Sequence, residues 1–163
     1  MACLVAPISG SYSVAWNSTA MGKDESGVRL ISRNHQAPVR SDYYGDSLLD
    51  LIYRGQDVSA MFTSLEYSNS PLGAGWPWAA TWGQMGVVGR LACGSSIAQP
   101  LVLTAVTGTP AAASPATITG SKAIVAEGHS LELLFANQVR TVPLAWNLLP
   151  YTSGDTVLWF STT

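Results

Sequence analysis

The segment Tyr43-Tyr44-Gly45-Asp46-Ser47-Leu48 holds the clearest candidate nucleophile in the chain, the hydroxyl of Ser47. A serine hydroxyl attacks a substrate only when a general base lies within hydrogen-bonding distance and a third group orients that base. The base is most often a histidine, so the chemistry of Ser47 depends on where the histidines of the chain lie. The alternative is that Ser47 is a turn residue with no catalytic part.

The tetrapeptide Gly45-Asp46-Ser47-Leu48 resembles the nucleophile motif of the GDSL family of serine esterases. The resemblance implies a serine just after a buried strand, a late D-x-x-H motif that supplies the base, and an oxyanion-hole asparagine in G-x-N. Residues 39–44 are too polar for a fully buried strand. Ala126 stands three residues before His129, and G-x-N does not occur. We therefore predict that Ser47 is a turn residue, and we expect no catalytic residue and no enzyme.

Metal and cofactor chemistry find equally little support. Asp42, Asp46 and Asp50 would share one face of a helix, but Gly45 disfavours a helix there. The calcium-loop pattern is not met, because position 44 is tyrosine. Neither histidine has a second histidine or a cysteine at metal-ligand spacing, and no phosphate-binding glycine motif occurs. We expect no metal and no cofactor, and we expect the carboxylates to cap turns.

The composition is that of one folded domain over residues 1–163 with very little charge. Hydrophobic residues make up 47% of the chain and charged residues 11%, against about 25% in a typical globular protein. Between Tyr67 and Ser121 the only charged residue is Arg90. That stretch is either buried core with loops of small residues or a large protein–protein interface, and the sequence leaves both open. The net charge of −2 offers no basic surface for tight nucleic-acid binding.

The chain carries no pattern of membrane insertion, secretion or disulfide bonding. Glycine, proline, serine and threonine interrupt every apolar run before 18 residues, so we expect no membrane anchor. The first ten residues lack the basic and apolar regions of a signal peptide. Cys3 and Cys93 are far apart and outside any CxxC motif, so we expect free thiols.

Apolar residues alternate with a period of two in many short segments, which predicts β-strands. Turn residues separate them at intervals of about ten residues, which favours an antiparallel sandwich or barrel. Pro143 lies inside one such pattern and predicts a sheet edge or a bulge there. Ser68 to Leu72 predicts the start of a short helix that ends near Trp76. The expected strands include 12–16, 58–65, 100–106, 131–135, 140–148 and 157–160.

The longer frame around Ser47, Tyr44-Gly45-Asp46-Ser47 to Ile52-Tyr53-Arg54-Gly55, resembles the Y-G-D-[ST]-x-x-D-x-I-Y-x-G segment of phage tail tube proteins. These are the major tail proteins of long-tailed bacteriophages. The later elements follow in the family's order: Glu66-Tyr67, a short helix leading to Trp76-Pro77, and a closing Trp159-Phe160. The resemblance runs from about Trp16 to the C-terminus. Three segments carry little of it, namely Val28 to Val39, Thr81 to Ser96 and residues 111–116, which we expect to form a loop rich in alanine and proline.

The resemblance implies a mainly β subunit, an antiparallel sandwich or barrel with one short flanking helix and an extended inter-strand loop. It further implies hexameric rings that stack into a hollow tail tube in the virion, assembled in the host cytoplasm. The partners would be other copies of the chain, the tape measure and terminator proteins, and DNA that passes non-specifically through the lumen. Open strand edges and low surface charge suit such an assembly.

Under this interpretation residues 43–55 form a loop between strands that reaches a neighbouring ring or subunit. Asp46 or Ser47 would cap a short turn or helix, and Leu48, Leu51 and Ile52 would anchor the loop. The alternatives are a tail terminator, a capsid decoration protein, a β-barrel ligand-binding module and an unrecognised enzyme. The residues expected at the subunit or ring interface are Tyr44, Gly45, Asp46, Leu48, Leu51, Ile52, Tyr53, Trp76 and Trp78.

Overall fold

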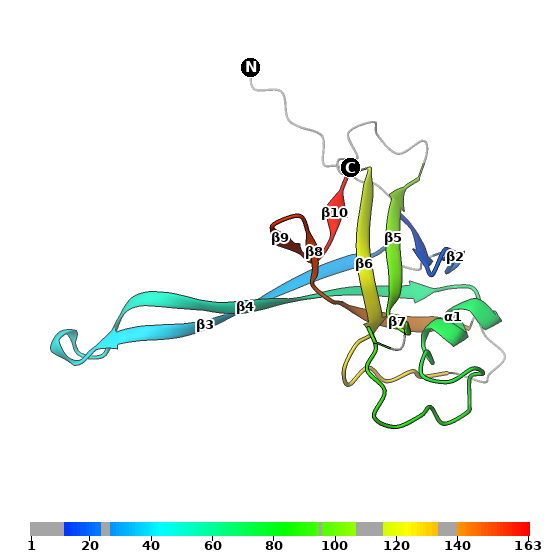
Figure 1. Ribbon diagram of the computed structural model, residues 1–163, viewed down its shortest axis with the longest axis horizontal. Coiled ribbons are helices and arrows are strands. Elements are labelled where there is room, and N and C mark those ends of the chain that lie inside the picture. The colour runs from blue at the N-terminus through cyan, green and yellow to red at the C-terminus, as the bar shows by residue number, and fades with distance from the viewer. Residues whose placement is uncertain (1–11, 24–26, 95, 107–115, 134–139) are drawn as a thin grey trace, which may run out of the picture.

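The computed structural model describes residues 12–23, 27–94, 96–106, 116–133 and 140–163. Within them the chain forms one eight-stranded antiparallel sheet, a two-stranded hairpin and one short helix (Figure 1). The strands of the sheet are ordered β2-β1-β5-β6-β7-β4-β3, and β10 pairs with β6 beside this path. The predicted mainly β, antiparallel fold with one short flanking helix is confirmed.

The bounds of the elements are as follows. The sheet contains β1 (Tyr12–Trp16), β2 (Thr19–Ala20), β3 (Arg29–Ser41), β4 (Ser47–Ser64), β5 (Gln99–Ala105), β6 (Thr117–Val125), β7 (Val142–Leu148) and β10 (Ser161–Thr162). The separate hairpin pairs β8 (Tyr151–Ser153) with β9 (Thr156–Leu158). The helices are α1 (Asn69–Ala74) and the 3-10 turn η1 (Asp42–Tyr44).

Period-two alternation places the main core on one face of the sheet. In β4 the buried side chains include Val58 and Phe62, and in β7 they include Leu144 and Trp146. Successive residues of a strand point to opposite faces, so these side chains share one side. Phe62 stacks on Trp146 with ring centroids 6.4 Å apart. The core also takes in Val14, Met21, Leu101, Leu103 and Ala123, with Leu72 and Ala74 of α1.

Figure 1 shows that β5 and β6 run steeply across the direction of β4 and β7, so the sheet twists strongly between its two halves. Pro143 lies opposite Thr63 of β4, whereas β6 pairs with β7 only at 146–148. Pro143 therefore sits where β7 is locally an edge strand, as predicted, and its missing N–H leaves no gap in a ladder. Ser68 is the N-cap of α1, although its hydroxyl makes no capping hydrogen bond.

Three expectations about local structure have a different outcome. The expected strand 157–160 is shorter, because β9 ends at Leu158. Leu131 to Leu133 is irregular rather than strand, and the rest of the 131–135 pattern lies outside the described residues, as does most of the 111–116 loop. The expectation that residues 43–55 form a loop is wrong for most of that range. Ser47 to Gly55 belongs to β4, which continues unbroken to Ser64 and pairs with β3 throughout.

Candidate functional site

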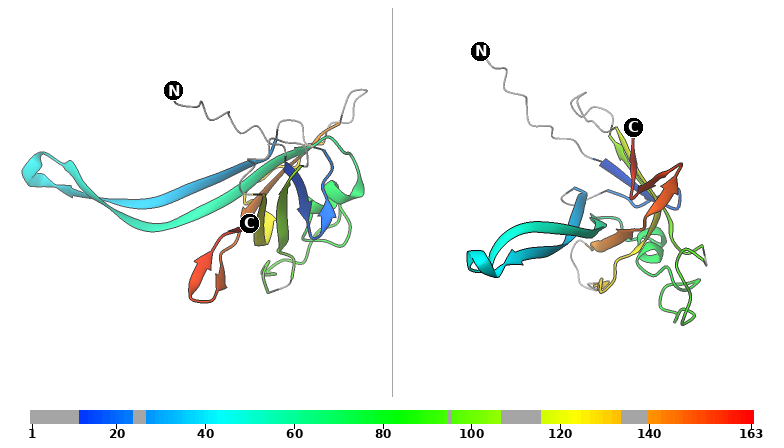
Figure 2. Two further views of the ribbon diagram at one scale, coloured as in Figure 1. Left: turned by 90° about the horizontal axis from the view of Figure 1, so that it is seen from above. Right: turned by 60° about the vertical axis from the view of Figure 1, so that its left-hand side comes forward.

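The β3–β4 hairpin extends far beyond the body of the subunit and is the first candidate site (Figures 1 and 2). β7 pairs with β4 only from Val58 onward, so residues 33–57 form a two-stranded ribbon with no third strand. We call residues 33–57 the arm. From Arg33 to Ser41 the ribbon spans about 26 Å at roughly 3.3 Å per residue. No residue of the arm is buried.

The tip of the arm explains the tetrapeptide Gly45-Asp46-Ser47-Leu48 as turn chemistry. Gly45 follows η1 with a φ of 67°, and Asp46 comes next with a φ of 61°. Glycine accepts this left-handed conformation without strain, and aspartate tolerates it better than most residues do. The N-cap position of η1 is Ser41 and its C-cap position is Gly45. The Ser47 hydroxyl donates to the carbonyl of Tyr44, the last residue of η1, so the expected capping of a short turn is confirmed for Ser47.

Neither histidine of the chain lies within reach of Ser47. Its hydroxyl donates to the carbonyl of Tyr44 at 2.5 Å, across the turn. Ser47 pairs with Ser41, whereas His35 pairs with Gly55, about 20 Å along the ribbon at 3.3 Å per residue. The Nε2 atom of His129 is occupied by the carbonyl of Pro143 at 3.1 Å. The geometry supports a turn role for Ser47.

Both faces of the arm carry exposed apolar side chains. Leu51 and Ile52 point to opposite faces, and they are 46% and 56% exposed. They are exposed strand residues, so the expectation that they anchor a loop is wrong. Tyr43 is 89% exposed, and with Tyr44 and Tyr53 it presents about 400 Å² at roughly 200 Å² per aromatic side chain. Leu48, Leu49 and Val39 add to this, so the exposed apolar area is larger than an ordinary surface patch.

Polar contacts and irregular register shape the arm. At its base the His35 Nε2 and Asp57 Oδ2 atoms are 2.6 Å apart, and at its tip Arg40 donates to the backbone carbonyl of Asp46 at 2.9 Å. The strand register shifts between His35 and Gln36 and again between Val39 and Arg40. Such shifts increase the twist of a ribbon. A two-stranded ribbon is only marginally stable in water by itself.

Trp76 and Trp78 lie outside the arm, in the connection between α1 and β5. Trp76 is partly exposed, and its indole Nε1 donates to the carbonyl of Gln84 at 2.6 Å. Trp78 is half-buried against a second core cluster of Ile97, Ala98 and Ile124. The predicted interface residues therefore divide into two groups, of which the structure brings together only the arm residues. Both tryptophans have packing or hydrogen-bonding partners inside the subunit.

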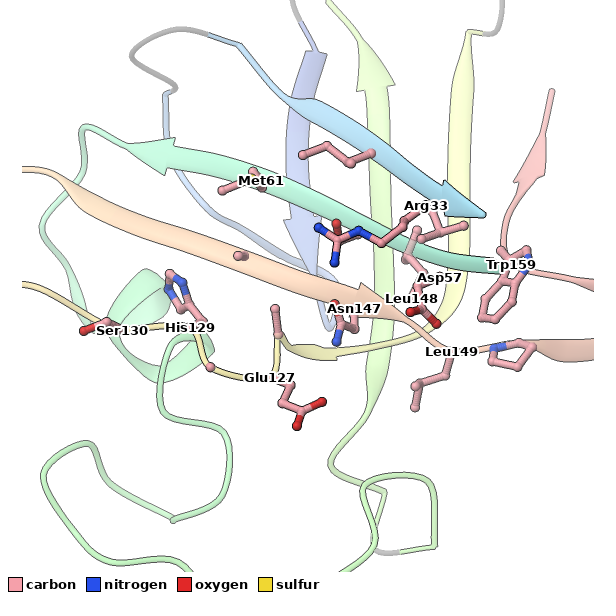
Figure 3. Close-up of a pocket in the computed structure, with 17 residues that line it drawn as sticks. Arg33, Asp57, Met61, Glu127, His129, Ser130, Asn147, Leu148, Leu149 and Trp159 are labelled. Carbon is pink, nitrogen blue, oxygen red and sulfur yellow. The ribbon is translucent and has the colours of Figure 1, made fainter. Parts of the chain in front are cut away.

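A groove of about 670 Å³ lies on the sheet face opposite the main core (Figure 3). Ile31, Ser59, Met61 and Asn147 line its floor, with parity opposite to that of the buried core residues. Figure 3 places Trp159 at one end and His129 and Ser130 at the other. Because Ile31 and Met61 remain exposed, the groove is open to solvent.

The groove holds charged groups but no recognisable catalytic constellation. Arg33, Asp57 and Glu127 line it together with His129. Neither histidine hydrogen-bonds a serine, threonine or cysteine of the described residues. Across the same part of the chain, no three His, Cys, Asp or Glu side chains gather closely enough to hold a metal ion. None of the described helices is long and apolar enough to cross a membrane.

One surface was not identified from the sequence. Trp82, Met85, Val87, Val88 and Leu91 are exposed on the connection between α1 and β5, which has no helix or strand over the described residues 75–94 and 96–98. The sequence carried one signal for it, the single charge of Arg90 within a long uncharged stretch. Cys93, in the same connection, is a free exposed thiol as expected, and Cys3 lies outside the described residues.

No protein-family model matches the chain, and no curated protein sequence matches it.

Proposed function

We propose that this chain is a self-assembling structural subunit of the tail tube of a long-tailed bacteriophage. In this role it forms rings of six copies that stack into a hollow tube and conduct DNA from the capsid to the host. The observation that carries the proposal is the arm, a ribbon whose apolar side chains are exposed and belong to neither core cluster of the described residues. A surface of this kind on a folded subunit favours a second protein surface as its environment.

The edges of the sheet support assembly through the backbone as well. The outer edge of β3 pairs with no other strand of the described residues over its thirteen residues. At the other end of the sheet the edge is short: β2 pairs with β1 at Ala15 and Trp16, and the N–H of Met21 donates to the carbonyl of Val14 at 2.9 Å. Unpaired edges are templates for a strand of another chain. Because the two edges belong to different strands, pairing one with the other joins subunits head to tail, and such contacts close into rings or extend into filaments.

The charge of the chain suits a conduit for DNA. The net charge of −2 and the absence of charge other than Arg90 between Tyr67 and Ser121 provide no Lys/Arg stripe to hold phosphates. DNA would then pass without strong contact to the wall. The tape measure and terminator proteins would be the other tail partners, and no cofactor or metal takes part in this function.

The experiment is negative-stain electron microscopy of the purified full chain, from low to high micromolar concentration, with sedimentation velocity on the same samples. We expect rings and stacked tubes whose abundance rises with concentration. Closed rings that never stack would instead indicate a terminator-like protein. A monomer that persists at the highest concentration would overturn the proposal.

A further inference from the structure

The connection between α1 and β5 presents a second apolar surface, distinct from the arm. Met85 is 85% exposed and Val88 is 82% exposed, with Trp82, Val87 and Leu91 beside them. We call residues 82–91 the apolar loop. Connections longer than about 15 residues without secondary structure are uncommon in compact domains and are usually either functional loops or linkers. The loop is therefore a candidate contact surface in its own right.

The apolar loop is fixed to the body of the subunit, so its exposed side chains are presented in a defined arrangement. Trp76 donates to the carbonyl of Gln84 at 2.6 Å. Gly86 lies against Trp78 so closely that a Cβ atom added to it would lie 2.5 Å from the Trp78 carbonyl oxygen. Beyond the loop, the N–H of Ile97 donates to the carbonyl of Ala92 at 2.9 Å. A surface held in shape in this way loses little conformational entropy when a partner docks.

The loop and the arm have complementary charges. Arg90 is exposed and forms no hydrogen bond or ion pair within the described residues. The tip of the arm carries Asp42, Asp46 and Asp50, and only Asp46 has a basic side chain nearby, that of Arg40 at 3.7 Å. The apolar loop therefore carries one cation without an ion-pair partner, and the tip of the arm carries more carboxylates than basic side chains.

The two surfaces cannot meet within one subunit. In the views of Figures 1 and 2 the arm leaves the body on one side and the connection that holds the apolar loop lies on the other. We infer that the arm of one subunit docks on the apolar loop of a second copy, with Asp50 beside Arg90. The contact joins two different surfaces, so it repeats from subunit to subunit. The inference rests on the proposed self-assembly and names the contact that carries it.

The first test exchanges charges across this contact. Arg90→Glu and Asp50→Arg should each raise the concentration at which half the chain is assembled by about fivefold, because an exposed ion pair contributes up to about 1 kcal/mol. The double variant should recover most of that loss, because the ion pair is restored with reversed sign. Asp155→Arg, an equally exposed change in the β8–β9 turn, serves as the matched control and should leave assembly unchanged.

The second test uses Cys93 as a chemical probe, in a chain with Cys3→Ser so that only one native thiol remains. Leu49→Cys places a thiol on the arm, and a short bismaleimide should then give a ladder of covalent oligomers. The ladder should be absent when Cys93→Ser is added, and absent when Asp155→Cys replaces the arm cysteine.

The outcomes separate the contact from the function. Assembly of the wild-type chain without the ladder, or without recovery in the charge-exchanged double variant, overturns the contact and leaves the proposed function standing. A chain that never assembles overturns both.

Discussion

Replacing Leu51 and Ile52 of the arm with serine should weaken assembly while leaving the subunit folded. Both side chains are about half exposed and lie on opposite faces of the ribbon. Because neither packs in the core, their removal takes nothing from the interior of the subunit. In a ring or tube, however, both faces of the arm can be covered by a second copy, so both side chains would contribute to the contact.

The expected size of the effect follows from the exposed fraction. Full burial of a leucine or isoleucine side chain contributes about 1.5–3 kcal/mol, so burial of the exposed half contributes about 1 kcal/mol. The two side chains together contribute about 2 kcal/mol to each contact, or about 30-fold in the association constant. Within the subunit, exposed substitutions usually change the free energy of unfolding by about 0.5 kcal/mol or less, with β-propensity adding up to about 1 kcal/mol.

The matched comparison is Leu144→Ala, which removes a core side chain that is 2% exposed. That change should lower the free energy of unfolding by about 2–5 kcal/mol and Tm by about 10 °C, at 2–4 °C per kcal/mol for a chain of this size. Sedimentation velocity measures assembly, and calorimetry of the dilute monomer measures stability. A double arm variant that assembles like wild type would refute the role of the arm. One that loses as much Tm as Leu144→Ala would show that the arm packs on its own body.

Three further predictions concern single residues. Trp146→Ala should lower the free energy of unfolding by about 3–5 kcal/mol in denaturant titrations, because the indole is 1% exposed and stacks on a core phenylalanine. Gly22→Ala should destabilise the subunit by more than about 1 kcal/mol, since Gly22 has a φ of +83° and an added Cβ would lie 2.5 Å from Glu66 Cβ. The control is Gly83→Ala, because Gly83 has a similar φ of +86° but lies in open space. Its effect should be milder and measures the backbone strain alone. A fluorophosphonate probe should leave Ser47 unlabelled in mass spectrometry, because the Ser47 hydroxyl has no histidine within reach, and labelling there would contradict the assignment as a turn.

Patterns that depend on neighbours in the chain predicted most of the body. Alternation over 58–65 and 140–148 identified two central strands, β4 and β7. The helix signal at Ser68 to Leu72 was sufficient for α1, and Pro143 correctly marked a place where one strand lacks a second neighbour. These features depend on local backbone chemistry and on burial of a single face.

The arm could not be recognised as a strand, because the alternation that reveals a strand depends on burial of a single face. The run 48–52 has apolar residues at both even and odd positions. Neither face of the arm is covered by the body, so packing does not require apolar and polar residues to alternate there. A run of this kind is compatible with a loop, a buried strand or an exposed ribbon. Only the pairing with β3 over 29–41 determines that it is a ribbon, and this pairing joins residues up to 32 positions apart in the chain.

The sequence alone determined that the chain folds as a mainly β domain with little charge, and that Ser47 lacks the companions of a nucleophile. It also placed the tetrapeptide at a turn, since glycine and aspartate accept the left-handed backbone that the turn requires. The tertiary structure decided where the exposed apolar side chains lie. It gathered Tyr43 to Tyr53 on an arm and left Arg90 with the apolar loop on another side of the body. Which surfaces remain open to solvent depends on how the whole chain packs, and no local pattern contains that information.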